Sequence, residues 1–174
     1  MNYYRLKEKN DLPNVLTPEF PSPSVIWSEN HPLFLLGRVQ REKDYLYFLS
    51  FYRSNVLSNA FLVAAEVWEI WREFQDGGRC RPCAFGHVST RQVKAYYLLL
   101  PKILDALHED TVYYWDGNLD TIVLSGKMVG TNQVFVVKGS TQMELLVSED
   151  VLEEMLRNNI VGFEYEYIEM RGDC

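Results

Sequence analysis

Two cysteines and a histidine in the middle of the chain form the sharpest pattern that could do chemistry. Cys80 and Cys83 are separated by two residues, Arg79 and Arg81 flank Cys80, and His87 follows. A Cys-x-x-Cys pair can supply half of a zinc site or act as a redox pair, and neighbouring arginines would lower the pKa of a thiol. The alternative is that both cysteines are structural or incidental.

Several features of the sequence argue against a metal or redox centre at this pattern. A structural zinc site normally has four ligands, and no second pair occurs at ribbon or finger spacing. The remaining Cys and His candidates are His31, His108 and Cys174. The pattern also lies outside any recognisable βαβ unit, where thiol redox motifs occur. We therefore expect no metal and no cofactor, and we keep as the alternative a small metal- or thiol-dependent enzyme or sensor centred on the Cys-x-x-Cys pattern and His87.

Other catalytic patterns are missing from the sequence. It has no Gly-x-Ser-x-Gly nucleophile elbow, no phosphate-binding Gly-x-x-x-x-Gly-Lys loop and no dinucleotide fingerprint. The three histidines are scattered among segments that read as loops or helix ends, so a catalytic triad would have to be assembled by the fold. The sequence therefore predicts a protein that is not an enzyme.

The charge of the chain is concentrated near its C-terminal end. The sequence has 24 acidic and 17 basic residues, which gives a net charge of −7. Residues 1–138 carry 15 of each sign, so the excess lies in residues 139–174, with 9 acids and 2 bases. Nucleic-acid binding requires a basic face that neutralises phosphates, so we expect no nucleic-acid partner. An acidic surface instead favours docking of a basic protein.

The acidic residues fall on two predicted elements. Ser148 reads as the N-cap of a helix with a buried stripe of Val151, Leu152, Met155 and Leu156, and residues 163–169 alternate as a strand. These acids could simply form the solvated face of the helix and the strand, or they could form a docking surface for a partner protein. The predicted partner-binding residues are Glu149, Asp150, Glu153, Glu154, Glu164 and Glu166. The two acids that follow Ser148 also favour the positive end of the helix dipole, and Tyr165 and Tyr167 are expected to face the core.

The first half of the chain mixes strand, connector and helix patterns. Residues 1–7 read as a strand, and residues 12–32 hold five of the seven prolines, which predicts an extended connector with no regular element except around Val25 to Trp27. The apolar runs 33–39 and 45–52 predict a β-hairpin with a charged tip at 40–44. Spacings of three and four predict a helix over 58–74, with Trp68, Trp71 and Phe74 as core residues.

The second half is strand-rich. Ser89 to Gln92 could cap a helix with one face at Val93, Tyr96 and Leu100, although Tyr96 to Leu100 could instead be a strand before a helix that starts at Pro101. Beyond His108 the patterns predict strands over 111–115, 121–124, 133–138 and 143–147, followed by the C-terminal helix and strand. We expect an α+β fold, with a mostly antiparallel sheet and helices packed on one face.

Length and composition indicate one globular unit. A chain of 174 residues that is 47% hydrophobic can bury a sizeable core, so residues 1–174 are predicted to form a single domain. The longest purely apolar runs, such as residues 60–65, are too short to cross a bilayer, so we expect no membrane association. The N-terminus lacks the apolar segment of a secretory signal, and the odd cysteine count is not a disulfide framework. A cytoplasmic location is expected, while the oligomeric state stays open.

The C-terminal third resembles a bacterial family of immunity proteins that accompany polymorphic and type VI secreted toxins. In that family a strand ending near a Lys-Gly turn leads to a Val-Ser-Glu helix and then to a Gly-Phe-Glu strand. The matching segments here are Gln133-Val134-Phe135-Val136-Val137-Lys138-Gly139, Leu145-Leu146-Val147-Ser148-Glu149-Asp150-Val151 and Asn159-Ile160-Val161-Gly162-Phe163-Glu164-Tyr165. The opening Met1-Asn2-Tyr3-Tyr4-Arg5-Leu6 is similar to the usual first strand of the family. The resemblance covers about 50 residues and does not include the middle of the chain.

The resemblance implies a small cytoplasmic antidote that binds a cognate toxin and blocks it without doing chemistry. Two observations from the residues agree with it: the sequence carries no catalytic pattern, and an acidic surface suits a basic toxin such as a nuclease. The expected partner is therefore a cognate toxin or effector protein.

Overall fold

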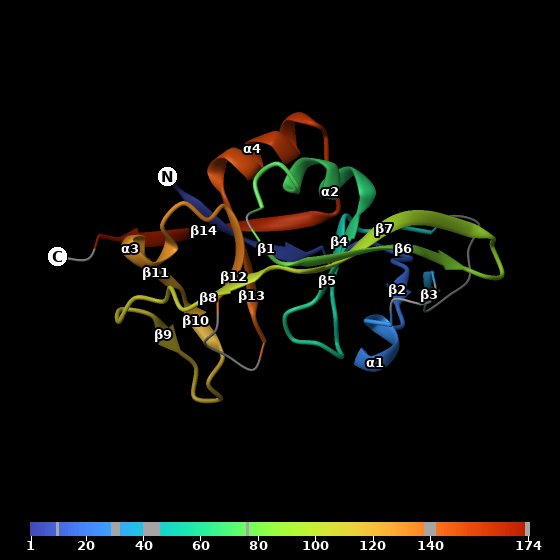
Figure 1. The fold of residues 1–174 in the computed structure, drawn as a ribbon, viewed down its shortest axis with the longest axis horizontal. Helices are drawn as coiled ribbons and strands as arrows, with labels where there is room; N and C mark the ends of the chain where they lie inside the picture. Colours follow the sequence, from blue (N-terminus) through green and yellow to red (C-terminus); the bar gives the residue numbers. More distant parts are fainter. Residues whose placement is uncertain (10, 29–31, 40–45, 76, 138–141, 173–174) are drawn as a thin grey trace.

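The computed structural model describes residues 1–9, 11–28, 32–39, 46–75, 77–137 and 142–172. Within these residues the chain forms two six-stranded sheets, a separate two-stranded sheet and four helices (Figure 1). Strand residues far outnumber helix residues, and antiparallel pairings outnumber parallel ones. The predicted α+β class is confirmed.

The first sheet has the strand order β11, β14, β1, β13, β12, β8. Its members are β1 (Tyr3–Glu8), β8 (Lys102–Leu104), β11 (Val123–Ser125), β12 (Val134–Val137), β13 (Glu144–Ser148) and β14 (Phe163–Arg171). Strand β1 lies between β14 and β13 and is antiparallel to both. The short strands at the two edges, β11 and β8, pair in parallel with β14 and β12.

The second sheet has the order β2, β3, β6, β7, β5, β4. Its members are β2 (Thr17–Pro18), β3 (Leu33–Arg38), β4 (Phe51–Arg53), β5 (Phe61–Ala64), β6 (Arg79–His87) and β7 (Gln92–Leu100). Strands β6 and β7 form a long antiparallel hairpin, and β8 follows directly after Pro101. The chain therefore passes from the second sheet into the first with a single residue between strands.

Two of the helices pack together on one side of the sheets. These are α2 (Ala65–Trp71) and α4 (Glu149–Arg157), which lie next to each other above the strands in Figure 1. The helix α1 (Pro23–Ile26) lies below the second sheet in the same view, and α3 (Gly126–Val129) follows β11 at the other end. None of the described helices is long and apolar enough to cross a membrane.

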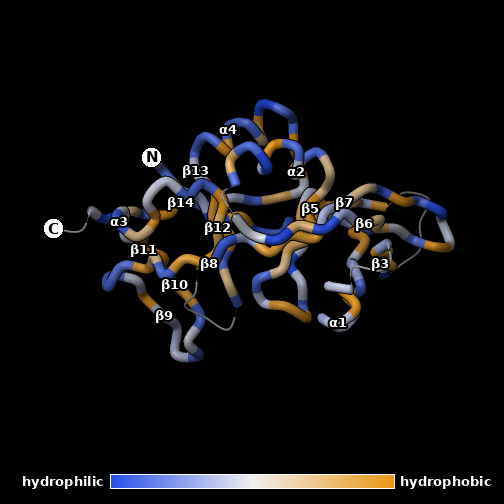
Figure 2. Tube along the Cα trace, viewed as in Figure 1, coloured by the Kyte–Doolittle hydropathy of each residue, from blue (hydrophilic) through white to orange (hydrophobic). Residues whose placement is uncertain are grey.

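The buried apolar residues form two clusters on opposite faces of the first sheet. The larger one joins the second sheet and both upper helices to the face that carries Leu6, Leu145 and Val147. The smaller one contains Tyr3 and Leu146 from the other face, together with residues in and around the two-stranded sheet. Figure 2 shows apolar segments along the inner strands.

The Pro-rich connector at 12–32 contains more regular structure than predicted. It supplies β2 and the single-turn helix α1, while residues 29–31 lie outside the described part of the chain. Leu16 and Ile26 are fully buried, and a Cβ added to Gly37 of β3 would lie 2.3 Å from Leu16 Cγ. The connector is thus packed into the core, which a proline count alone does not reveal.

The predicted hairpin of residues 33–39 and 45–52 is wrong. Strand β3 pairs with β2 and in parallel with β6, whereas β4 pairs with β5. Tyr47 forms an isolated parallel bridge with Val15 of the connector instead. The predicted tip at 40–44 lies outside the described residues. Two adjacent apolar runs indicate two strands. Which strands pair with each other depends on the arrangement that buries the apolar face of each strand.

Two predicted helices are wrong in part or entirely. The segment 58–74 begins as the fully buried strand β5 and becomes helical only at Ala65, because a short apolar run does not distinguish a buried strand from a helix. The helix expected after Ser89 is absent: residues 88–91 are the turn between β6 and β7, with Arg91 at a φ of +55°. The alternative strand at Tyr96 to Leu100 is confirmed, but β8 replaces the helix expected from Pro101.

Most of the remaining predicted elements are confirmed, but the strand predicted over 121–124 is wrong, because it spans the end of β10 (Leu119–Thr121) and the start of β11, which belong to different sheets. The structure has β1 at the N-terminal end, short strands after His108, and α4 followed by β14. Trp71 is fully buried, and Trp68 and Phe74 pack against the same core. Leu156 is the exception within the predicted stripe of α4, because its side chain is 45% exposed.

Candidate partner-binding surface

The helix α4 is fixed by its cap and by its apolar stripe. Ser148 Oγ accepts a hydrogen bond from the backbone N–H of Val151 at 3.4 Å, as expected for an N-cap. Val151, Leu152 and Met155 are buried against the sheet, where α4 contacts β13 and β1. The acidic residues of the helix are therefore directed away from the core.

Three tyrosines lie on the same face of the sheet as α4. Tyr4 of β1 pairs in register with Tyr167, and its ring lies 5.9 Å from the rings of both Tyr165 and Tyr167. Tyr165 and Tyr167 are 51% and 57% exposed, so the prediction that they face the core is wrong. The reason is that α4 packs on β13 and β1, which leaves this face of β14 open to solvent.

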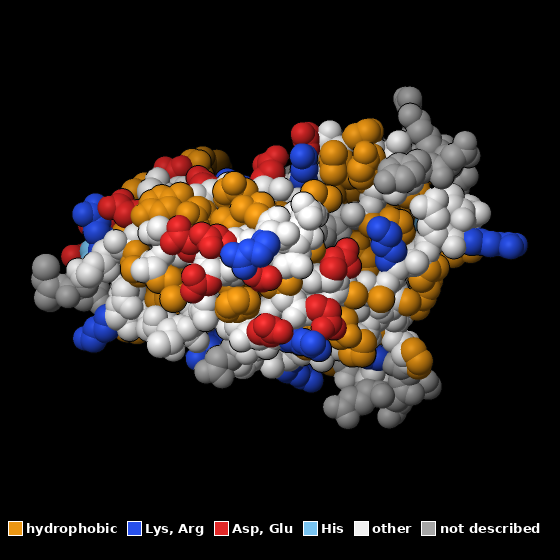
Figure 3. Space-filling view, turned by 90° about the horizontal axis from the view of Figure 1, so that it is seen from above, with side chains coloured by type: hydrophobic (Ala, Val, Ile, Leu, Met, Phe, Trp, Pro, Cys, Tyr) orange, Lys and Arg blue, Asp and Glu red, His pale blue; other side chains and the backbone are white. Residues whose placement is uncertain are grey.

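Carboxylates of α4 border these rings. Desolvation raises the pKa of Tyr4, the charge of Glu149 adds to this shift, and Glu153 contributes further. Glu153 is exposed, and Glu149 Oε2 accepts a hydrogen bond from Asn2 Nδ2 at 3.0 Å. We call Tyr4, Tyr165, Tyr167, Glu149 and Glu153 the tyrosine–glutamate surface. Figure 3, which looks down on this side of the molecule, shows acidic and hydrophobic side chains interspersed over it.

The six predicted partner-binding acids do not form one surface. Asp150 is exposed in the first turn of α4, and Glu154 pairs with Arg157 and accepts a hydrogen bond from Asn158 at 2.8 Å. Glu164 and Glu166 alternate with the exposed tyrosines of β14, so they lie on the opposite face of the sheet. The structure brings together only the carboxylates of α4.

The opposite face holds an ion-pair cluster around Glu144. Glu144 has a side-chain exposure of only 7%, and its carboxylate lies 3.0 Å from Arg5 Nη2 and 2.9 Å from Arg53 Nη2. Glu166 extends the cluster, because its Oε2 lies 2.6 Å from Lys7 Nζ and 3.8 Å from Arg5 Nη1. Glu166 therefore has a structural role that the sequence pattern did not assign to it.

The cysteine pattern lies in strand β6, not in a loop. Residues 80 and 83 are an odd number of positions apart, so their side chains leave the strand on opposite faces, and Cys80 is exposed while Cys83 is buried. His87 Nδ1 lies 3.2 Å from Thr90 Oγ1. Among the described residues, no three His, Cys, Asp or Glu side chains are grouped so that they could hold a metal ion.

The arginines beside Cys80 engage the helix α1 and the residue after it. The Arg79 guanidinium lies 4.6 Å from the ring centroid of Trp27, and Arg81 Nη1 donates a hydrogen bond to the carbonyl of Ile26. Burial raises the pKa of the Cys83 thiol to about 12, despite an opposing effect of Arg81, and desolvation raises that of Cys80 to about 11. Neither thiol therefore has the lowered pKa that the alternative of a reactive Cys-x-x-Cys pair would require.

We expect both thiols to be unreactive at neutral pH. An increase of the Cys80 pKa from 9.0 to about 11 lowers its thiolate fraction about 100-fold at pH 7.5, and alkylation proceeds through the thiolate. In a Cys174→Ser background, alkylation of Cys80 by iodoacetamide should be about 100-fold slower in the folded protein than in urea. Cys83 should be slower still. Rapid alkylation of the folded protein, or about one zinc per purified chain, would favour the alternative metal or thiol function.

A pocket of about 790 Å³ lies between the N-terminal connector and strands β3 and β4. Several of its charged side chains already have partners within the fold. Glu8 accepts a hydrogen bond from the backbone N–H of Arg53, the Arg53 side chain pairs with Glu144, and Arg38 pairs with Glu19. Burial raises the pKa of Glu8, and the bond from Arg53 opposes this shift. These contacts make the charged lining part of the scaffold.

Sequence reasoning missed a second exposed feature, the hairpin formed by β9 (Val112–Tyr113) and β10 (Leu119–Thr121). Its strand pattern was recognised, but its exposure was not, because a strand with aromatic side chains is normally at least half buried. Trp115 at its turn is 98% exposed. A local charge count would have given a signal, because residues 103–126 contain five acids and no Lys or Arg.

Comparison with known proteins adds no family assignment. No family model matches the sequence, and a search of curated proteins found no match.

Proposed function

We propose that this chain is an immunity protein that binds and neutralises a cognate secreted bacterial toxin in the cytoplasm, without catalysing a reaction itself. The observation that carries the proposal is the tyrosine–glutamate surface, where three tyrosines and two carboxylates lie together on the side of the first sheet that α4 packs against. Tyrosines are enriched in the energetic centres of protein interfaces because each buries a large area and keeps a polar end. Bordering carboxylates favour a basic partner and speed its association.

The resemblance to immunity proteins supports the same proposal. The matching segments that the structure describes contribute to β12, β13, α4 and β14, which are neighbours in space around β1. The similar opening residues contain β1 itself. The resemblance and the tyrosine–glutamate surface therefore coincide in one part of the fold. In this proposal the chain acts as a single domain, with α2 and α4 packed on the face of the first sheet that carries the tyrosine–glutamate surface.

The experiment is a binding measurement between the purified chain and the toxin domain encoded by the neighbouring gene. The wild-type chain should co-purify with this toxin and should rescue growth of cells that express it. A chain that neither binds nor protects against the toxin would contradict the proposal. The adjacent gene is the right probe because immunity proteins are expected to be encoded beside the toxin they block.

We expect the double variant Tyr165→Ala/Tyr167→Ala to weaken toxin binding by about 100-fold, because truncating two interface tyrosines typically costs about 2–3 kcal/mol in total. Glu149→Lys/Glu153→Lys should slow association and reverse its dependence on salt. Isothermal titration calorimetry and stopped-flow mixing check the two effects. Glu164→Lys is the matched control, because it changes the charge of the same strand on the opposite face. An equal loss in this control would contradict the assigned surface.

A further inference from the structure

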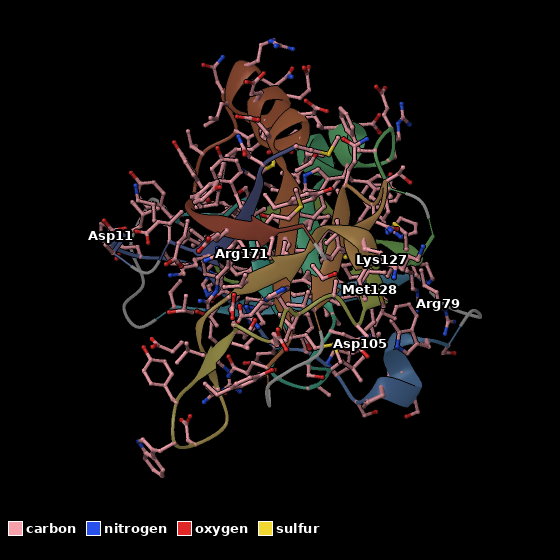
Figure 4. The ribbon with its side chains drawn as sticks, turned by 90° about the vertical axis from the view of Figure 1, so that its left-hand side faces the viewer. Asp11, Arg79, Asp105, Lys127, Met128 and Arg171 are labelled. Carbon is pink, nitrogen blue, oxygen red and sulfur yellow. The ribbon has the colours of Figure 1, made fainter. Side chains whose placement is uncertain are left out.

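The hairpin of β9 and β10 presents an exposed run of apolar side chains. Val112, Tyr113 and Tyr114 are 49%, 48% and 54% exposed, and the adjacent Trp115 is 98% exposed. The hairpin forms its own two-stranded sheet and projects from the body of the molecule (Figures 1 and 4). Four consecutive exposed residues of this size are unusual on a monomeric surface and are typical of an interaction site.

The base of the hairpin is firmly attached to the body. The Thr111 hydroxyl donates to the carbonyl of Val123 at 3.0 Å and accepts from the backbone N–H of Val123 at 3.2 Å. The backbone N–H of His108 donates to the same carbonyl at 2.8 Å. Leu119 and Ile122 are buried in the smaller core cluster. The exposed rings therefore stand on a fixed support.

The turn of the hairpin is ordered by its own hydrogen bonds. The N–H of Tyr114 donates to the carbonyl of Asn118 at 2.8 Å, and the N–H of Gly117 donates to the carbonyl of Tyr114 at 3.0 Å. Gly117 has a φ of +81°, a conformation that glycine adopts without strain. The backbone N–H and the side-chain amide of Asn118 donate to the two oxygens of Asp116 at 3.0 and 2.8 Å. A preformed turn loses little conformational entropy when it binds.

The hairpin and its flanks carry only one sign of permanent charge. Residues 103–126 include no Lys or Arg, and they contain Asp105, Glu109, Asp110, Asp116 and Asp120. Asp110 is partly neutralised by Arg171, whose Nε lies 3.8 Å from its Oδ2. At the turn, the hydrogen bonds from Asn118 lower the pKa of Asp116, so this carboxylate is charged at neutral pH. The end of the hairpin therefore combines a free indole with a fixed negative charge.

We propose that this hairpin inserts into a basic cleft of the toxin, the cleft in which a nucleic-acid substrate would otherwise bind. A cleft of that kind offers cations for phosphates and flat surfaces for bases. A nucleic acid presents flat bases and anionic phosphates to such a cleft. The adjacent indole of Trp115 and carboxylate of Asp116 likewise present a flat ring and an anion on one rigid turn. This inference rests on the proposed function and adds to it the class of toxin, a nuclease, and the element that blocks it.

A second copy of this chain is the competing occupant. The pocket beside the N-terminal connector is lined in part by Lys9, Pro13 and Phe20, which could also receive an acidic aromatic turn. Such a contact would join unlike surfaces of two copies and would continue into chains of molecules. Trp115-dependent self-association of the purified protein, measured by light scattering, would overturn the proposed insertion into a toxin.

The test compares variants of the hairpin with a control on another turn. Trp115→Ala should weaken binding to the purified toxin at least 30-fold, and Asp116→Asn should weaken it about 10-fold and reduce the salt dependence. Val88→Ala is the matched control, because Val88 is also exposed, at 69%, in the turn between β6 and β7. All three variants should keep the thermal unfolding midpoint of the wild type, because none removes a buried group.

A competition experiment identifies the cleft. A single-stranded oligonucleotide of about 20 nucleotides should displace the wild-type chain from a toxin variant that binds but does not cleave nucleic acid. Wild-type binding that is unaffected by Trp115→Ala would overturn the role of the hairpin and leave the proposed function intact. Binding that depends on Trp115 but resists the oligonucleotide would overturn the cleft. Absence of wild-type binding would overturn both the inference and the proposed function.

Discussion

Replacing Trp71 by alanine is expected to lower the free energy of unfolding by about 3–5 kcal/mol, the usual cost of truncating a fully buried aromatic side chain to alanine. Trp71 is completely inaccessible to solvent, and its indole N–H donates to Met155 Sδ at 3.2 Å, which joins α2 to α4. The substitution leaves a large cavity between these helices. Because stabilities of about 5–15 kcal/mol are typical, this loss would remove a large share of the free energy of unfolding.

Urea denaturation followed by circular dichroism measures this effect. Trp115→Ala and Trp68→Ala are matched controls, because the first removes a 98% exposed indole and the second a half-buried ring stacked on Tyr97. We expect a change within about 0.5 kcal/mol for the first control and an intermediate loss for the second. A loss below about 1 kcal/mol for Trp71→Ala would show that the contact between α2 and α4 does not stabilise the fold.

The second large effect is expected for Glu144→Ala, which should lower the free energy of unfolding by about 3 kcal/mol. Glu144 is the shared partner of Arg5 and Arg53, and its removal leaves two guanidinium groups in a largely dehydrated site. Breaking a buried ion pair costs about 3–5 kcal/mol. We expect the lower end of this range because the two arginines keep 18% and 21% of their side-chain exposure and can be partly hydrated.

Chemical denaturation at pH 7 checks this prediction, with Glu164→Ala as the control. Glu164 lies on the same sheet but is exposed, so its removal should change the stability by less than about 0.5 kcal/mol. The cluster also joins the two large sheets, because Arg5 belongs to β1 and Arg53 to β4. Equal effects of the two substitutions would mean that this ionic connection contributes nothing to stability.

The sequence was sufficient to predict the elements whose ends have strong local signals. Ser148 followed by two acids defined the start of α4, and Gly117 correctly marked the turn after β9. Helix and strand were confused where residues are buried on all sides, as at Phe61 to Ala64, because such a segment shows no useful periodicity. Strand pairing was not predictable either, since β3 pairs with β6 across more than 40 residues of sequence.

The candidate site was predicted in part. The acids of α4 were identified because helix caps and charges are local features, whereas the place of Tyr165 and Tyr167 depends on which strands the helix covers. The net charge pointed only to the C-terminal end. It concealed the acidic stretch around β9 and β10, because basic residues elsewhere in the first 138 positions balance it. A windowed charge profile would have exposed this feature, although not the exposure of Trp115.

The arrangement of the first sheet has a consequence for how the protein is made. Strand β1 occupies an interior position, yet its neighbours β13 and β14 lie about 140 to 165 residues further along the chain. Contacts between such distant segments require the closure of a long loop, which slows folding. During synthesis β1 emerges well before β13 and β14, so neither of its edges can be paired until those later strands have been made. The first sheet can therefore be completed only after β14 has been synthesised, and the contacts of Tyr4 with Tyr165 and Tyr167 depend on that step.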